Sequence, residues 1–345
     1  MGGGGSLKVL ITGGTGFIGN RLTIGALERG WSVSVLTRRP ETPRARAVAL
    51  AGARLLLGDV TDRDSLRRAL EVAQPQRLLH GAGWYELGIR RSARRRMRAV
   101  NVDGVENVLS LAVENGVDRV VYVSSTTALG DTGGLVADER FERRAPARSW
   151  YEATKAEAHA LALRHQQMGE PLLIAAPAQV VGPGDHSAFG VLARLFVRRR
   201  LPPLGGGAEG AFTFAHVEDV AQAILAVSER GRIGETYFLG GETLTVRQLM
   251  EVWKRVERRR PVWGWLPRPL AMVQAALLTP FLRLAGQPAF LSTEVVRSGY
   301  ASFRYSSAKV IGEIGVTFRP AARSWEETLE SEREIMERER WEARR

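Results

Sequence analysis

The sequence predicts an α/β fold built on a doubly wound parallel sheet, with a smaller mixed C-terminal lobe. From Leu7 onward, short runs that are apolar along their whole length alternate with longer amphipathic runs. This alternation is typical of parallel strands joined by helices that cover both faces of a sheet. After Pro177 the pattern breaks into short segments separated by glycine and proline, which indicates a lobe of shorter elements. We therefore expect the sheet lobe over residues 7–177 and the smaller, substrate-binding lobe over residues 178–345.

The expected elements of the larger lobe follow one another in a regular order. Strands are expected at residues 7–12, 31–37, 54–59, 77–82, 119–125 and 171–176. Helices are expected at residues 17–29, 62–72, 93–114 and 150–168. Within residues 211–240, a helix at 217–228 and a short strand at 235–241 are expected to return to the larger lobe. Residues 1–6 are expected to form a flexible leader, and residues 324–345 a charged amphipathic helix.

The composition excludes several classes of protein. A chain of 345 residues with 44% hydrophobic and 25% charged residues can bury a sizeable core, so it is not a disordered protein. The absence of cysteine excludes disulfides, thiolate metal sites and a cysteine nucleophile, and it is consistent with a cytoplasmic protein. The histidines show no metal-ligand spacing, so we expect no metal. Redox chemistry therefore requires a bound cofactor.

The net charge of +12 comes from arginine, because only four of the 49 basic residues are lysines. The arginine blocks at 94–96 and 258–260 lie among glutamate and apolar residues, which is typical of a solvated surface and does not indicate nucleic-acid binding. The most apolar stretch, residues 269–282, has 14 residues, fewer than the ~20 of a membrane-spanning helix. Peripheral contact of this stretch and its neighbouring arginines with an anionic membrane is an open alternative.

A glycine pattern lies between the first strand and the first helix, in the segment LKVLITGGTGFIGNRL. Gly13 permits a tight turn, Gly16 lets backbone amides approach a pyrophosphate, and Gly19 lets the helix pack closely on the strand. The amino terminus of the helix also favours an anion, so the segment predicts a dinucleotide site. Its GxxGxxG spacing resembles the extended branch of the short-chain dehydrogenase/reductase family, which implies a Rossmann fold. The resemblance adds three cofactor contacts, Thr15, Phe17 and Ile18.

The residues that follow the second strand favour NADPH over NADH. A site that prefers NAD carries an acidic residue here, which accepts hydrogen bonds from the ribose hydroxyls. This chain has Arg38 and Arg39 instead, and a guanidinium pairs well with a 2′-phosphate. We expect Arg38 to be the main phosphate reader and Arg39 to assist it. The alternative is that both arginines are surface residues and the site does not discriminate.

The resemblance also assigns cofactor contacts to later strand ends. Asp59 and Val60 in LLLGDVTD are implied to meet the adenine. The segment APAQVVGPGDH resembles the dihydroflavonol reductase and 3β-hydroxysteroid dehydrogenase subgroup, which implies that Pro177 and Val180 lie near the nicotinamide amide. Three residues of RLLHGAG are expected to line the cofactor channel, namely Gly81, Ala82 and Gly83.

The segment YEATK places Tyr151 and Lys155 four residues apart, so both lie on one face of a helix. Reduction of a carbonyl creates an alkoxide that must gain a proton, and moving a phenol pKa from ~10 to about 7 requires ~4 kcal/mol. Lys155, helped by the positive nicotinamide in the oxidised complex, is the available source of that stabilisation. The order of serine, tyrosine and lysine resembles the family's catalytic set, which implies that Tyr151 is the proton donor and that Lys155 also binds the nicotinamide ribose. It implies Ser125 as the hydrogen-bond partner of the substrate carbonyl, with Ser124 as second candidate.

Asn101 lies in AVNVDGVENVL, which resembles the family segment whose asparagine supports a water relay to the active-site lysine. Asn101 is therefore included among the expected catalytic residues. A buried asparagine bonded to backbone is the other interpretation, and it is compatible with the same role.

Five residues are expected to contact the substrate: Trp84, Tyr85, Thr126, Leu129 and Gln179. The apolar and aromatic residues among them and in the smaller lobe favour a hydrophobic carbonyl or alcohol. The expected reaction is therefore the NADPH-dependent, reversible reduction of a ketone or aldehyde on a hydrophobic small molecule.

Two alternatives to this function are open. A nucleotide-sugar epimerase or dehydratase shares the fold and the tyrosine and lysine, but it retains NAD, which Arg38 disfavours. A non-catalytic NADPH-binding regulator typically lacks the tyrosine or the lysine, and both are present here. The resemblance also implies a homodimer formed through the helices at 94–114 and 151–168.

Overall fold

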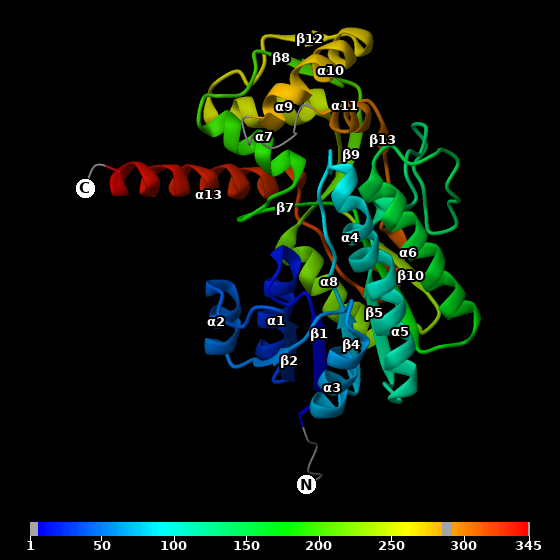
Figure 1. Ribbon diagram of the computed structural model, residues 1–345. Helices are drawn as coiled ribbons and strands as arrows, with labels where there is room; N and C mark the ends of the chain where they lie inside the picture. The colour runs from blue at the N-terminus through cyan, green and yellow to red at the C-terminus, as the bar shows by residue number, and fades with distance from the viewer. Residues whose placement is uncertain (1–5, 285–291, 344–345) are drawn as a thin grey trace.

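The fold is a seven-stranded parallel sheet covered by helices on both faces, with a second lobe beyond the carboxyl ends of the strands (Figure 1). The computed structural model describes residues 6–284 and 292–343, so residues 1–5 of the expected leader and 344–345 of the expected last helix lie outside the described residues. The strands are β1 (Lys8–Thr12), β2 (Ser32–Thr37), β3 (Arg54–Leu57), β4 (Arg77–His80), β5 (Arg119–Val123), β6 (Leu172–Pro177) and β10 (Thr236–Leu239). The predicted doubly wound sheet is confirmed.

The strand order, β10-β6-β5-β4-β1-β2-β3, reverses between β1 and β4. In open α/β sheets, ligands bind outside the carboxyl ends of the strands at such a reversal. Thr12 and His80 end these two strands side by side, and Thr12 Oγ1 lies 2.6 Å from His80 Nδ1. The glycine segment that follows β1 therefore begins at the crevice where this fold binds its ligands.

Helices cover the two faces of the sheet. The helices are α1 (Phe17–Glu28) and α8 (Val217–Arg230) on one face, and α3 (Arg63–Ala73), α5 (Gly104–Glu114) and α6 (Trp150–Gln167) on the other. Each face has its own core of buried aliphatic side chains. A further helix, α2 (Pro43–Leu50), is not among the predicted helices. Two helix-start signals mark it in the sequence, namely the capping residue Thr42 and a proline in the first turn.

Two segments from the second half of the chain join this sheet lobe. α8 packs on α1, and β10 pairs with the edge strand β6, as the patterns at 217–228 and 235–241 predict. Residues 211–216 do not return with them, because they form β9 (Ala211–His216) in a separate sheet. β9 and β10 are both buried and largely apolar, so composition alone does not assign either strand to its sheet.

The helix expected at 93–114 is interrupted. A 3₁₀ turn (Arg91–Ala93) and α4 (Arg94–Arg98) lead into a π-helical turn at Ala99–Asp103, and α5 follows. π-helical turns are rare and frequent at functional sites. Asn101 lies in the middle of this turn and is buried.

The second lobe combines a small mixed sheet with an aromatic core. Its strands are β7 (Gln179–Val181), β9, β11 (Thr243–Thr245) and β13 (Ser302–Phe303), with β8 (Leu204–Gly206) and β12 (Gly264–Leu266) as a separate pair. Its helices are α7 (Ala188–Val197), α9 (Val246–Glu257), α10 (Arg268–Leu284), α11 (Thr293–Gly299) and α13 (Ala321–Glu342), whereas α12 (Ala308–Ile314) packs on β10. Trp253 and Trp325 are fully buried in the core. Among the described residues, no helix is long and apolar enough to cross a membrane.

Candidate active site

The glycine segment after β1 is folded in a way that larger residues would prevent. Gly13 has a positive φ of 71°, and a Cβ on it would lie 2.6 Å from the backbone nitrogen of Ala82. A Cβ on Gly19 would lie 2.0 Å from the carbonyl oxygen of Gly13. α1 begins after Gly16 without a side-chain cap, so its first-turn amides are available to an anion. The segment therefore fits the pyrophosphate of a dinucleotide.

Two cavities of about 420 Å³ and 380 Å³ meet at this segment. Four glycines line both cavities, namely Gly13, Gly16, Gly81 and Gly83. The larger cavity is called here the catalytic cavity and the smaller one the adenosine cavity. Together they contain every residue that the sequence places at the cofactor.

The adenosine cavity contains the two arginines that follow β2, together with Asp59 and Val60. The side chain of Arg38 is 58% exposed, and its Nη1 lies 3.7 Å from Asp59 Oδ2. Asp59 Oδ1 is occupied by hydrogen bonds from the backbone and side chain of Thr61, both at 2.9 Å. This long, exposed ion pair holds Arg38 weakly, so its guanidinium is available to a phosphate in the cavity.

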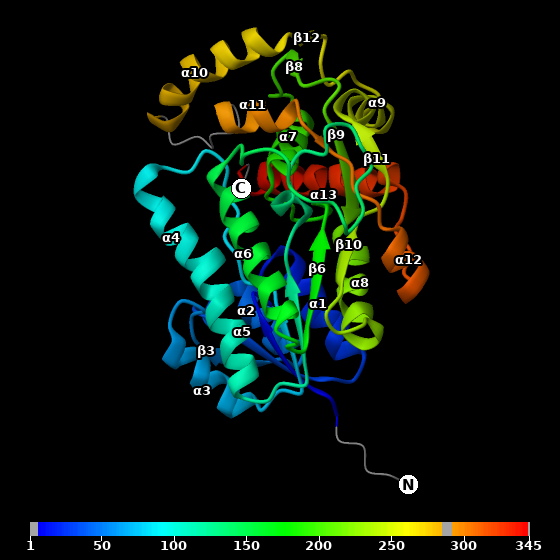
Figure 2. The same cartoon turned by 90° about the vertical axis from the view of Figure 1, so that its right-hand side faces the viewer.

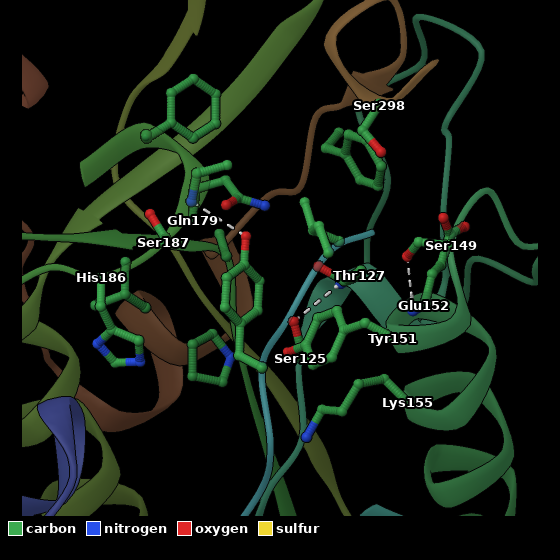
Figure 3. Close-up of a pocket in the computed structure, with 18 of the residues that line it drawn as sticks. Ser125, Thr127, Ser149, Tyr151, Glu152, Lys155, Gln179, His186, Ser187 and Ser298 are labelled. Atoms are coloured by element: carbon green, nitrogen blue, oxygen red, sulfur yellow. Dashed lines mark hydrogen bonds between the residues drawn. The ribbon is translucent and has the colours of Figure 1, made fainter. Parts of the chain in front are cut away.

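Ser125, Tyr151 and Lys155 point into the catalytic cavity (Figure 3). Tyr151 lies in the first turn of α6, which Ser149 caps by accepting a hydrogen bond from Glu152 N at 3.0 Å. Lys155 lies one turn later and donates to Val123 O at 3.4 Å and to Tyr122 Oη at 3.5 Å. The structure therefore brings together the three residues of the expected catalytic set.

Burial controls the proton affinities of these groups. It raises the pKa of Tyr151 to about 12, and a hydrogen bond with Ser125 partly offsets this rise. Burial also lowers the pKa of Lys155 to about 8. The protein groups by themselves hold the phenol pKa above its ordinary value, and the expected shift toward 7 also involves the positive charge of an oxidised nicotinamide. A raised pKa keeps the phenol protonated at neutral pH, which suits a proton donor.

A buried polar layer lies next to Lys155, and the sequence patterns do not predict it. The ring of Tyr122 stacks on that of His80 at 5.6 Å. Ser124 Oγ lies 2.9 Å from His159 Nδ1, so His159 engages the second serine candidate. Burial and the nearby Lys155 lower the pKa of His80 to about 3 and that of His159 to about 4. A signal was present, since His159 follows Lys155 by four residues on one helix face.

Both polar atoms of the Asn101 side chain form hydrogen bonds with neighbouring residues. Its Oδ1 accepts a hydrogen bond from Trp84 N at 2.7 Å, and its Nδ2 donates to Trp84 O at 3.0 Å and to Thr154 Oγ1 at 3.1 Å. Asn101 also lines the catalytic cavity. This arrangement matches the interpretation of a buried asparagine that bonds backbone, and Asn101 fixes the segment after β4 against α6.

The structure places three of the five expected substrate residues at the catalytic cavity, namely Trp84, Tyr85 and Gln179. Thr126 and Leu129 do not line either cavity, contrary to expectation. Thr126 is buried at the start of a 3₁₀ turn (Thr126–Ala128), and the turn directs Leu129 into the aromatic core of the second lobe.

The second lobe supplies most of the remaining cavity wall, and most of that wall is apolar. Its apolar members are Phe189, Leu192, Phe212, Val246, Val295, Val296, Tyr300 and Phe303. The polar side chains of His186, Ser187 and Ser298 also face the cavity (Figure 3). The sequence suggests an apolar substrate site but identifies few of these residues, because short elements separated by long loops bring them together.

The described residues contain no group of three or more histidine and carboxylate side chains placed to hold a metal ion. The expected catalytic set supplies hydroxyl groups and one amine beside a dinucleotide site, a combination typical of hydride-transfer enzymes.

Comparison with known proteins identifies the class. Residues 9–240 match the NAD dependent epimerase/dehydratase family, and the chain belongs to that family. A Synechocystis protein with the provisional name dihydroflavonol 4-reductase is 28% identical over 323 residues, covering 89% of each chain. A Stigmatella aurantiaca 4-hydroxy-2-methyl-3-oxo-4-farnesyl-3,4-dihydroquinoline-1-oxide ketoreductase is 29% identical, covering 79% of each chain. The crystal structure of a protein named gox2253 has a TM-score of 0.80 and 28% identity, covering 96% of this chain and 99% of that one.

Proposed function

We propose that this protein reduces a ketone or aldehyde on a hydrophobic small molecule, with NADPH as the reductant. The observation that carries the proposal is the convergence of Ser125, Tyr151 and Lys155 in one cavity whose other walls are largely apolar. The similarity to a ketoreductase that acts on a farnesylated ring system also supports it. When bound, the nicotinamide supplies the hydride.

The residues of the chain have separate roles in this reaction. Ser125 donates a hydrogen bond to the substrate carbonyl oxygen and orients it. Tyr151 gives its phenolic proton to the same oxygen as negative charge develops there. Lys155, held by Val123 O and Tyr122 Oη, stabilises the phenolate that remains. The apolar walls exclude water, which strengthens these interactions.

The two arginines that follow β2 support NADPH as the proposed cofactor. Arg38 and Arg39 line the adenosine cavity, where an acidic residue would repel a 2′-phosphate. The weakly held Arg38 guanidinium is suited to pair with that phosphate through two charge-assisted hydrogen bonds. This arrangement favours a reductase that exchanges NADPH over an epimerase that retains NAD.

The test is consumption of NADPH and NADH against aromatic ketones, an aldehyde, a dihydroflavonol and a ketosteroid, with a nucleotide sugar as control. NADPH-dependent turnover of a hydrophobic carbonyl is the expected result. Tightly retained NAD together with conversion of the nucleotide sugar would instead establish an epimerase or dehydratase. Cofactor binding with no turnover of any compound would favour the non-catalytic regulator.

We also infer a cytoplasmic homodimer formed through the outer faces of α5 and α6. Val113 on α5 and Leu163 on α6 are 42% and 37% exposed, so apolar area is available on this side. Light scattering of the purified protein tests the dimer, and its loss in Leu163→Glu would support this interface.

A further inference from the structure

α10 lies at the end of the second lobe that is far from the seven-stranded sheet (Figure 1, Figure 2), and an exposed apolar stripe runs along this helix. The stripe consists of Leu270, Val273, Leu277, Leu278 and Phe281, whose exposed fractions lie between 37% and 69%. Spacings of three and four residues keep these side chains on one face of the helix. Trp263, at 76% exposed, lies shortly before the helix in the chain.

α10 packs in the reverse of the usual amphipathic arrangement. Among the described side chains of α10, only Ala271 and Ala275 are buried. Ala271 lies close to β8, because a Cβ added to Gly206 would be 3.7 Å from the Cβ of Ala271. The large apolar side chains face outward, whereas a surface helix normally buries them. Contiguous exposed apolar patches mark interaction surfaces.

Basic side chains also lie beside the stripe. Arg268 is the first residue of α10, and Arg297 lies on α11, which packs on α10. Both arginines are exposed, and neither forms an ion pair with a residue that the structure describes. An apolar helix face beside unpaired arginines is complementary to a surface that is apolar inside and anionic at its boundary.

We propose that α10 docks the protein on an anionic lipid bilayer, with the stripe among the upper acyl chains and the arginines at the headgroups. A second copy of the chain is a poorer partner, because a symmetric contact would bring the unpaired arginines of two copies together. The docking proposal does not rest on the proposed reaction. α11 packs on α10 and contributes Val295 and Val296 to the catalytic cavity, so docking places that cavity next to a store of apolar molecules.

Flotation of the full chain with lipid vesicles tests the proposal. The protein should bind phosphatidylcholine vesicles that contain phosphatidylglycerol, should bind pure phosphatidylcholine weakly, and should dissociate as salt rises. Leu277→Glu should weaken binding about tenfold, because one inserted leucine is lost. Leu50→Glu is the matched control, since Leu50 is an exposed leucine on α2, 89% exposed and far from the stripe in the chain. Thermal melting verifies that both variants remain folded.

The fluorescence of Trp263 gives a second readout that does not depend on the Leu277 variant. Brominated lipids should quench part of the tryptophan emission, and Trp263→Phe should remove that part. Three results would overturn the proposal: no binding to anionic vesicles, equal loss of binding in both glutamate variants, or a change of oligomeric mass in Leu277→Glu without lipid binding by the unaltered protein. The last result would show that a second copy covers the stripe.

Discussion

The ring of Tyr85 stands edge-on against the ring of Tyr151, with the two centroids 4.8 Å apart and an interplanar angle of 77°. The Tyr85 hydroxyl accepts a hydrogen bond from Ala188 N at 3.2 Å. One side chain therefore ties the segment after β4 to the start of α7 and holds the proposed proton donor in place.

Tyr85→Ala should lower kcat/KM about tenfold, because an aromatic pair contributes about 1 kcal/mol to positioning. Tyr85→Phe keeps the ring and loses the bond to Ala188, so most of the activity should remain. Steady-state kinetics with a hydrophobic ketone measures both variants. Equal losses in the two would show that the hydroxyl, and not the ring contact, positions Tyr151.

Tyr151→Phe should reduce turnover about a thousandfold, which is the scale of general acid catalysis. NADPH affinity should stay nearly unchanged, because the phenylalanine ring fills the same space. Lys155→Ala should weaken both turnover and NADPH binding. Fluorescence titration of NADPH beside single-turnover kinetics separates the two effects, and full activity in Tyr151→Phe would exclude the proposed mechanism.

Arg38→Asp should shift cofactor preference from NADPH toward NADH. Loss of a charge-assisted bond, with repulsion from the new carboxylate, should weaken NADPH binding about a hundredfold. Arg67→Asp is a suitable control, because Arg67 lies on α3 in an exposed ion pair with Asp64 and outside both cavities. An unchanged ratio of the two dissociation constants in Arg38→Asp would show that another group reads the phosphate.

Gly19→Ala should abolish dinucleotide binding and lower the melting temperature. Its added Cβ would lie 2.0 Å from Gly13 O, a backbone atom that cannot move without opening the glycine turn. Gly312→Ala is the matched control within α12, since nothing lies within 4 Å of its added Cβ. That control should be stabilised by about 0.5–1 kcal/mol through helix propensity. A normal melting temperature for Gly19→Ala would contradict this account of the turn.

His159 should make stability depend on pH. Burial lowers its pKa from 6.5 to about 4, so between these values the unfolded chain binds a proton that the folded chain does not. Its contribution, about 3 kcal/mol, is therefore complete above pH 6.5 and is lost as the pH falls toward 4. Urea denaturation at several pH values should show a shallower slope for His159→Gln than for the unaltered protein. Identical slopes would show that His159 is not held neutral.

The sheet lobe could be predicted because its strands are buried on both faces, and double burial leaves a continuous apolar run that a sequence displays directly. The dinucleotide and catalytic segments could be predicted because the functional residues of each segment are close together in the sequence. They lie within a few residues of one strand end or within one helix turn. Thr126 and Leu129 show where this reasoning stops. Their positions depend on the path of a 3₁₀ turn, and sequence spacing alone does not give the direction in which such a turn sends its side chains.

The second lobe was less predictable for a related reason. Val295 and Val296 line the catalytic cavity from a helix of seven residues, which has little helical stability of its own. The packing of this short helix on α10 sets its arrangement. His159 was predictable in part. Its four-residue spacing from Lys155 is visible in the sequence and places both on one helix face. That spacing does not show that Ser124, at the end of β5, lies beside His159.

The late position of β10 and α8 in the chain bears on how the protein is made. During synthesis, β6 has no partner on its outer edge, and the face under α8 has no cover, until residues beyond 239 have left the ribosome. Open sheet edges and bare apolar faces are the features of nascent chains that chaperones protect from aggregation. A fragment that stops at Pro177 would keep both features permanently. The nucleotide lobe is therefore contiguous in space but not an autonomous folding unit in the sequence.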